Sequence, residues 1–79
     1  MVLLEFTIEP FVDGAPGRHV TAAVEAAEAL GASIEFGPFG SACEVPADRA
    51  AAVTAAVVAA ALANGATHVS LHAAQVVTS

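Results

Sequence analysis

The centre of the chain reads Glu35-Phe36-Gly37-Pro38-Phe39-Gly40-Ser41-Ala42-Cys43-Glu44. This stretch predicts two short strands that reverse through a Gly-Pro-Phe-Gly turn, because glycine adopts positive φ and proline fixes φ at about −65°. The hairpin divides the chain into two similar halves. A strand and an amphipathic helix are expected before it, and a helix and a strand after it.

The first strand is expected over Val2–Glu9, where apolar and polar residues alternate with the period of two typical of a half-buried strand. Pro10 ends it by removing a ladder donor. Glu5 and Thr7 lie on its polar face. They either meet solvent or line a polar site on the open side of a sheet.

Two helices are expected, the first over Arg18–Leu30 and the second from Pro46 to Ala63. Their apolar residues recur at helical spacing. Gly31 is a natural terminator of the first helix, and Asn64-Gly65 ends the second. The second helix carries almost no charge beyond Arg49, which indicates a tightly covered helix or a subunit contact.

The remaining strands are expected over residues 33–36, 41–45 and 68–77. The order β-α-β-β-α-β is that of the ferredoxin-like, split βαβ arrangement. We therefore predict one α+β domain over residues 1–79, with a four-stranded antiparallel sheet and two helices on one face. Right-handed crossovers place the first and third strands at the sheet centre. Glu5, Thr7, Ser70 and His72 then share the opposite face.

The composition limits the possible partners. The 79 residues are 57% hydrophobic and 13% charged, which favours self-association of a chain too short for a large core. Eight acidic residues against two arginines give a net charge of −6. This balance argues against nucleic-acid or anionic-membrane binding, and it suits a cationic ligand or a metal ion, or solubility alone.

The sequence shows no targeting segment, and its one cysteine fits a reducing compartment, so we expect a cytoplasmic protein. The uncharged run from Ala50 to Thr67 is interpreted as a buried helix and not as a membrane span.

No catalytic motif is recognisable. Cys43 lies in a predicted strand without an activating base and is interpreted as a buried structural thiol. His68 and His72 are about 13 Å apart along a strand, so they cannot chelate one ion together. We expect neither an enzyme nor a metal site within one chain.

Three segments resemble the thiamine-binding protein family, also known as the YkoF-like or DUF77 group. They are Glu5-Phe6-Thr7-Ile8-Glu9-Pro10, the central Gly37-Pro38-Phe39-Gly40-Ser41-Ala42-Cys43-Glu44, and Asn64-Gly65-Ala66-Thr67-His68-Val69. The resemblance covers nearly the whole chain. It implies a ferredoxin-like domain that pairs through its sheets into homodimers or homotetramers. It also implies binding of thiamine or its hydroxymethylpyrimidine portion without chemical conversion.

The resemblance implies a set of ligand-binding residues. An acid (Glu5 or Glu44) would pair the aminopyrimidine edge, hydroxyls (Thr7 and Ser41) would add hydrogen bonds, and an aromatic ring (Phe39 or Phe36) would stack. The backbone of Gly37 and Gly40 would approach the ligand closely, and His72 is a further candidate. The chain departs from the family after Ala73, where relatives carry a charged tail, and at Arg18. Two alternatives stay open: a ligand-free interaction or regulatory module, and a small ferredoxin-fold enzyme.

Overall fold

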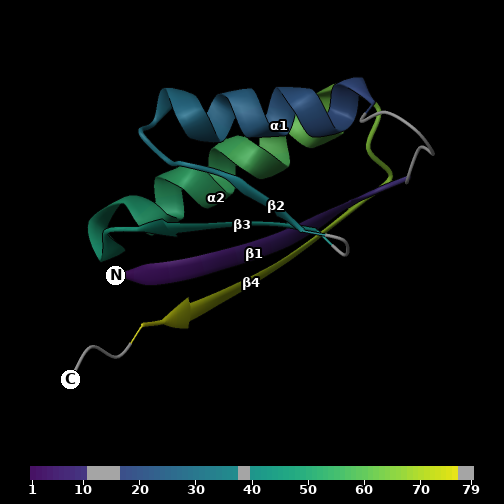
Figure 1. The fold of residues 1–79 in the computed structure, drawn as a ribbon. Coiled ribbons are helices and arrows are strands. Elements are labelled where there is room, and N and C mark those ends of the chain that lie inside the picture. Colours follow the sequence, from purple (N-terminus) through teal and green to yellow (C-terminus); the bar gives the residue numbers. More distant parts are fainter. Residues whose placement is uncertain (11–16, 38–39, 77–79) are drawn as a thin grey trace.

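The computed structural model of the protein describes residues 1–10, 17–37 and 40–76. These residues form a four-stranded antiparallel sheet with both helices packed on one face, as Figure 1 shows. In chain order the elements are β1 (Val2–Glu9), α1 (Arg18–Ala29), β2 (Glu35–Gly37), β3 (Gly40–Val45), α2 (Ala47–Ala63) and β4 (His68–Gln75). The α+β ferredoxin-like fold predicted from the sequence is therefore confirmed.

The strand order is β2-β3-β1-β4, so the first and third strands form the sheet centre as predicted. Strand β1 pairs with β3 through Val2↔Val45 to Phe6↔Ser41 and with β4 through Val2↔Gln75 to Glu9↔His68. Residues opposite one another on neighbouring strands lie on the same face. These registers therefore fix which side chains reach each side of the sheet.

The predicted boundaries of β2 and β4 need correction. Strand β2 begins at Glu35 and not at residue 33. The residues just after α1 are still hydrogen-bonded to that helix, since the Gly31 amide donates to the carbonyl oxygen of Glu28 and the Ala32 amide to that of Ala27. Gly31 has φ of 88°, so it ends the helix as predicted. Strand β4 ends at Gln75, and helix α1 ends at Ala29 with Leu30 as its C-cap.

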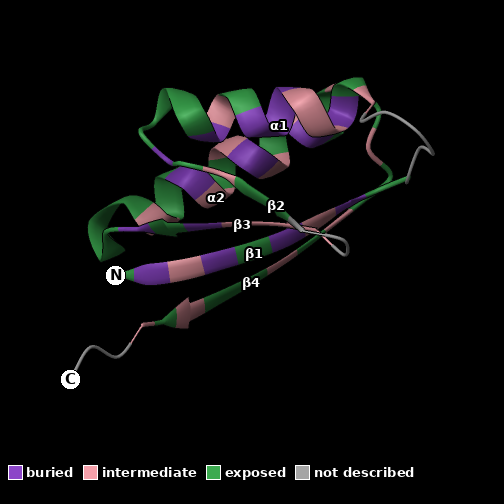
Figure 2. Cartoon of the chain, in the orientation of Figure 1, coloured by how far each residue is buried: buried purple, intermediate pink, exposed green. Residues whose placement is uncertain are grey.

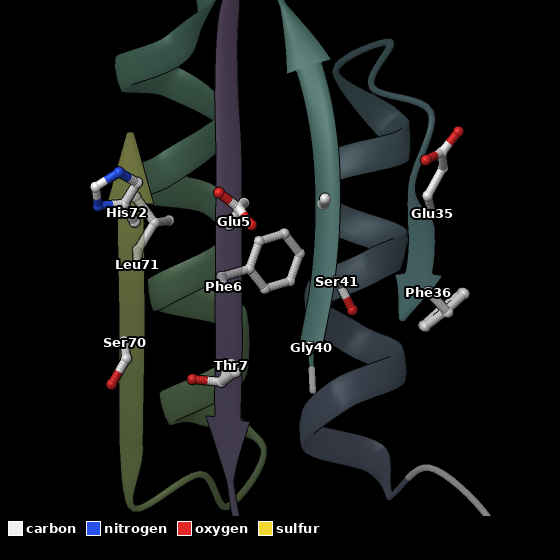
Figure 3. Close-up of a pocket in the computed structure, with 11 residues that line it drawn as sticks. Glu5, Phe6, Thr7, Glu35, Phe36, Gly40, Ser41, Ser70, Leu71 and His72 are labelled. Atoms are coloured by element: carbon white, nitrogen blue, oxygen red, sulfur yellow. The ribbon is translucent and has the colours of Figure 1, made fainter. Parts of the chain in front are cut away.

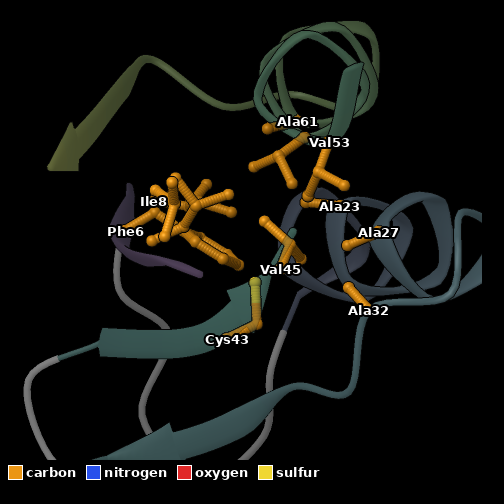
Figure 4. Packing of buried hydrophobic residues seen from close by; sticks show 12 residues of the cluster. Phe6, Ile8, Ala23, Ala27, Ala32, Cys43, Val45, Val53 and Ala61 are labelled. Carbon is orange, nitrogen blue, oxygen red and sulfur yellow. The ribbon is translucent and has the colours of Figure 1, made fainter. Parts of the chain in front are cut away.

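The core lies between the helices and the sheet. Alternate residues of β1 are buried, as the banding of that strand in Figure 2 shows. They pack against small and branched side chains of both helices, seen in Figure 4. Fully buried Val53, Val57 and Ala61 form the inward stripe of α2. Small side chains on both helices let the helical layer approach the sheet closely.

Both arginines lie on the helices, and each makes a contact at the surface of the helical layer. The Nη1 atom of Arg49 donates to the carbonyl oxygen of Leu30 at 2.9 Å and so ties α2 to the end of α1. The Nη1 atom of Arg18 lies 3.7 Å from Oε2 of Glu25 on the same helix. Neither guanidinium lies on the sheet.

No helix in the described part of the chain is long and apolar enough to cross a membrane.

We expect Leu4→Ala to lower the free energy of unfolding by about 2–5 kcal/mol, because it empties a site that is 1% exposed at the centre of the core. Leu62 on α2 is 53% exposed, so Leu62→Ala is the matched control and should change stability by no more than about 0.5 kcal/mol. Urea unfolding followed by circular dichroism, at one protein concentration, measures both. Equal effects would contradict the assigned core.

Candidate functional site

The helices leave one side of the sheet uncovered, and we call this side the open face. A row of four side chains crosses it, one from each strand, because Glu35 pairs with Ala42, Ala42 with Glu5, and Glu5 with His72. Beside this row Thr7 pairs with Ser70. The open face is therefore polar at its middle, and the residues Glu5, Thr7, Ser70 and His72 share it as predicted.

A cavity of about 530 Å³ lies over this row, and Figure 3 shows the residues that line it. All four strands contribute to its walls. The lining residues are Glu5, Phe6, Thr7, Glu35, Phe36, Gly40, Ser41, Ala42, Ser70, Leu71 and His72. Its volume lies within the range of small-molecule sites, about 300–1,000 Å³.

Two carboxylates flank the smallest side chain of the row. Neighbouring strands are about 4.8 Å apart, so the backbones of Glu5 and Glu35, two strands apart, are separated by about 10 Å. Ala42 stands between them and leaves the space above it empty. This spacing leaves room for a planar ring between two carboxylates.

Both carboxylates are exposed and available to a ligand. Among the described residues, Arg18 forms an ion pair with Glu25, and His68 Nδ1 lies 3.6 Å from Glu9 Oε2; neither contact involves Glu5 or Glu35. The cavity lining contains no lysine or arginine. The site thus presents uncompensated acceptors, with the His72 imidazole opposite Glu5.

An aromatic side chain stands at the rim of the cavity. Phe36 lies on the edge strand β2, and it is 66% exposed, although its register partner Ser41 lies on the helix side of the sheet. Phe36 also lines the cavity, and an exposed phenyl ring can stack on a flat group or attract a cationic one.

The start of β3 approaches β1 unusually closely. A Cβ atom built on Gly40 would lie 2.7 Å from the carbonyl oxygen of Phe6 and 2.8 Å from Cγ2 of Thr7. Only glycine fits there without moving a strand. Gly40 therefore maintains the floor of the cavity next to Thr7.

A smaller cavity of about 370 Å³ adjoins the first and shares Glu35 and Ala42 with it. Glu44 lines this second cavity and pairs with Leu3 across the sheet. The structure therefore places Glu44 on the open face, but beside the main cavity and not within its lining.

Most of the predicted site residues are brought together. Glu5, Thr7, Gly40, Ser41 and His72 all line the main cavity. Ser41 is half-buried and pairs with Phe6 of β1, whose side chain lies in the core. By this register the Ser41 side chain lies on the helix side of the sheet, opposite to that of Thr7, although the residue still lines the cavity. Gly37 pairs with Gly40 in the hairpin, and Phe39 lies outside the described residues.

Glu35 lines the cavity but was not among the predicted site residues. The available signal was the alternation within the hairpin: a turn that pairs Gly37 with Gly40 also pairs Glu35 with Ala42. His19 was not predicted either; it is 6% exposed and has Nε2 2.6 Å from the carbonyl oxygen of Pro10. That contact fastens the end of β1 to the start of α1 and is structural.

Cys43 is buried at 3% exposure on the helix side of β3, so the prediction of a buried thiol is confirmed. Burial raises the pKa of the Cys43 thiol, which keeps it protonated at neutral pH. Among the described residues, no three His, Cys, Asp or Glu side chains are placed to hold a metal ion.

Neither a protein-family model nor a curated protein sequence matches the chain. Solved structures do. A domain of unknown function DUF77 from Bacillus cereus superposes with a TM-score of 0.65 at 22% identity, covering 92% of this chain and 71% of that one. A hypothetical protein from Methanocaldococcus jannascii gives a TM-score of 0.64 at 22% identity, covering 91% and 74%. The DUF77 domain agrees with the resemblance in sequence, and the likeness at this identity establishes the fold.

We expect Gly40→Ala to destabilise the protein by about 1–3 kcal/mol, because the added methyl group collides with the Phe6 backbone and forces β3 away from β1. Gly65→Ala is the control, since Gly65 has φ of 101° but no atom within 4 Å of the added Cβ. Thermal unfolding compares the two. A loss at Gly40 no larger than at Gly65 would show that the close approach of the strands is not required.

Proposed function

We propose that the protein binds thiamine, or its hydroxymethylpyrimidine portion, on the open face of the sheet and does so without chemical conversion. The observation that carries this proposal is the placement of Glu5 and Glu35 on either side of Ala42 in a cavity of about 530 Å³. The choice of thiamine as the ligand rests on the resemblance in sequence to the thiamine-binding protein family. The geometry supports a flat, donor-bearing, cationic molecule of that kind.

The aminopyrimidine ring offers an exocyclic amino group and ring nitrogen acceptors. A carboxylate accepts only, so Glu5 or Glu35 would accept hydrogen bonds from the amino group. The hydroxyls of Thr7 and Ser70 and the imidazole of His72 can donate to the ring nitrogens. All of these groups belong to the cavity lining, so one ring could contact a donor and an acceptor together.

The thiazolium ring carries a permanent positive charge. It is attracted to the two carboxylates, to the net charge of −6, and to the exposed face of Phe36. The pyrophosphate ester would bring negative charge into the same cavity. Because both arginines lie on the helices and neither lines the cavity, that charge would find no permanent cation in the lining.

The proposal includes a homo-oligomer in a reducing compartment, as in the cytoplasm. The single cysteine is buried, and Met1, Leu30 and Phe36 are apolar side chains exposed on one copy. For a chain of 79 residues, association with further copies is an ordinary way to bury such surface.

We expect Glu5→Gln and Glu35→Gln each to weaken thiamine and hydroxymethylpyrimidine binding about 10-fold or more, because each removes a charged acceptor worth about 1.5–3 kcal/mol. Isothermal titration calorimetry measures this. Glu28→Gln on α1 is the control, since it changes the net charge equally on an exposed helix position outside the cavity lining. Glu44→Gln tests the second cavity and should have the smaller effect.

Two outcomes would contradict the proposal. Equal weakening by Glu5→Gln and Glu28→Gln would show that only net charge matters. No heat and no thermal stabilisation with either compound would remove the ligand, and the open face would then be interpreted as a surface for protein contact.

We expect thiamine to bind more tightly than thiamine pyrophosphate, and the difference to narrow as salt is raised. The cavity walls are acidic and lack lysine and arginine, so they repel the pyrophosphate, and salt screens that repulsion. Titration with both compounds at two salt concentrations tests this. Tighter binding of the pyrophosphate form would contradict the assigned preference.

A further inference from the structure

One side chain in the lining of the main cavity can change its charge near neutral pH. The described lining residues include two carboxylates, Glu5 and Glu35, and one imidazole, that of His72. Carboxylates are ordinarily ionised above about pH 5, whereas histidine gains or loses its charge between about pH 5 and 8. The described lining therefore carries two negative charges when His72 is neutral and a net of one when it is protonated.

The His72 imidazole stands beside the carboxylate of Glu5. The two residues are direct partners across β4 and β1, so their Cβ atoms lie about 5 Å apart on the open face. Figure 3 shows both side chains on this face of the two neighbouring strands. The other acidic lining residue, Glu35, lies on β2 at the far edge of the sheet. Protonation of His72 therefore acts first on Glu5.

The remaining charged groups near β4 lie further from this imidazole. His68 is on the same strand, four residues away, or about 13 Å along it. Its register partner on β1 is Glu9. Helix α2 also contacts β4, but from the opposite side of the sheet, and its charged residues Asp48 and Arg49 lie in its first turn. Among the described residues, Glu5 is the charged group that faces His72.

The other two histidines of the chain have different surroundings and do not line the cavity. His19 is buried, with Nε2 2.6 Å from the carbonyl oxygen of Pro10. Nδ1 of His68 lies 3.0 Å from Oγ1 of Thr67. The His72 side chain is exposed, so it can be protonated or replaced without disturbing the core.

We propose, on the basis of the proposed function, that His72 sets the charge selectivity of the cavity through its protonation state. With the imidazole neutral, the cavity prefers the cationic thiamine. Protonation of the imidazole weakens thiamine binding and shifts the preference toward the pyrophosphate ester of thiamine.

The electrostatic reason is the difference in charge between the two compounds. A protonated imidazole repels the thiazolium ring and competes with the ligand's amino group for the carboxylate of Glu5. Both compounds share these two groups, so both lose affinity in this way. The pyrophosphate adds negative charge that only the ester carries, and a protonated imidazole can donate a charge-assisted hydrogen bond to it. His72 is then the one cation in a described lining without lysine or arginine.

The first experiment measures the affinities of thiamine and thiamine pyrophosphate by isothermal titration calorimetry at about pH 8 and about pH 5.5. The ligands can gain protons of their own over this range, so the wild type is compared with His72→Gln, which keeps hydrogen-bonding groups but carries no charge. His68→Gln removes a histidine of the same strand outside the cavity lining and is the matched control.

We expect acidification to lower the affinity ratio of thiamine to its pyrophosphate about 10-fold more in the wild type than in His72→Gln. His68→Gln should follow the wild type. A ratio that falls as steeply in His72→Gln as in the wild type, or a pH dependence lost equally in His68→Gln, would overturn the proposed role of His72 and leave the proposed function intact. Failure of both compounds to bind at either pH would overturn the proposed function and the role of His72 together.

A second experiment uses the wild type alone. Binding and protonation are reciprocally linked, so a ligand that is weakened by protonation of His72 must make that protonation harder. In NMR titrations of the imidazole C–H signals, thiamine should shift the His72 transition to lower pH, and the pyrophosphate should shift it less or to higher pH. The His68 signal is the internal control and should respond to neither. A His72 transition that thiamine leaves in place, or moves together with that of His68, would overturn the proposal.

Discussion

Strand β1 is the element on which the rest of the structure depends, because it is hydrogen-bonded on both sides and its two faces have opposite character. Its even-numbered residues, all apolar, enter the core, and Glu5 and Thr7 project from the open face. A shift of one residue against either neighbour would bury the polar set and expose the apolar one. Burial of the apolar face therefore fixes the register of β1 with β3 and β4, and this register places the residues that line the cavity.

Alternation made much of this arrangement predictable from the sequence. The period of two over Val2–Glu9 placed Glu5 and Thr7 on the polar face, and the order of elements placed β1 and β3 at the centre. Together these gave the grouping of Glu5, Thr7, Ser70 and His72. Helix ends were also accessible, because Gly31 and Gly65 adopt the positive φ that ends each helix.

The register of the β2–β3 hairpin is harder to predict from the sequence, and the faces of Ser41 and Glu35 depend on that register. Ser41 was grouped with Thr7 by its chemistry, whereas the pairing Phe6↔Ser41 turns it toward the helix side. The sequence predicts Glu35 only as part of a strand, although the pairing Glu35↔Ala42 brings it to the cavity. A short strand has too few residues for its alternation to be clear, so only the ladder reveals its faces.

The structure separates acidic from basic side chains: Glu5 and Glu35 line the cavity, and both arginines lie on the helices. A net charge of −6 by itself favours solubility as much as ligand binding. Here the two arginines lie on the helices, where one caps α1 and the other faces Glu25, so neither offsets the carboxylates of the open face. The sheet has one acidic, uncovered face. The open face therefore concentrates the carboxylates of the sheet where neither arginine offsets their charge, and such a surface attracts cations.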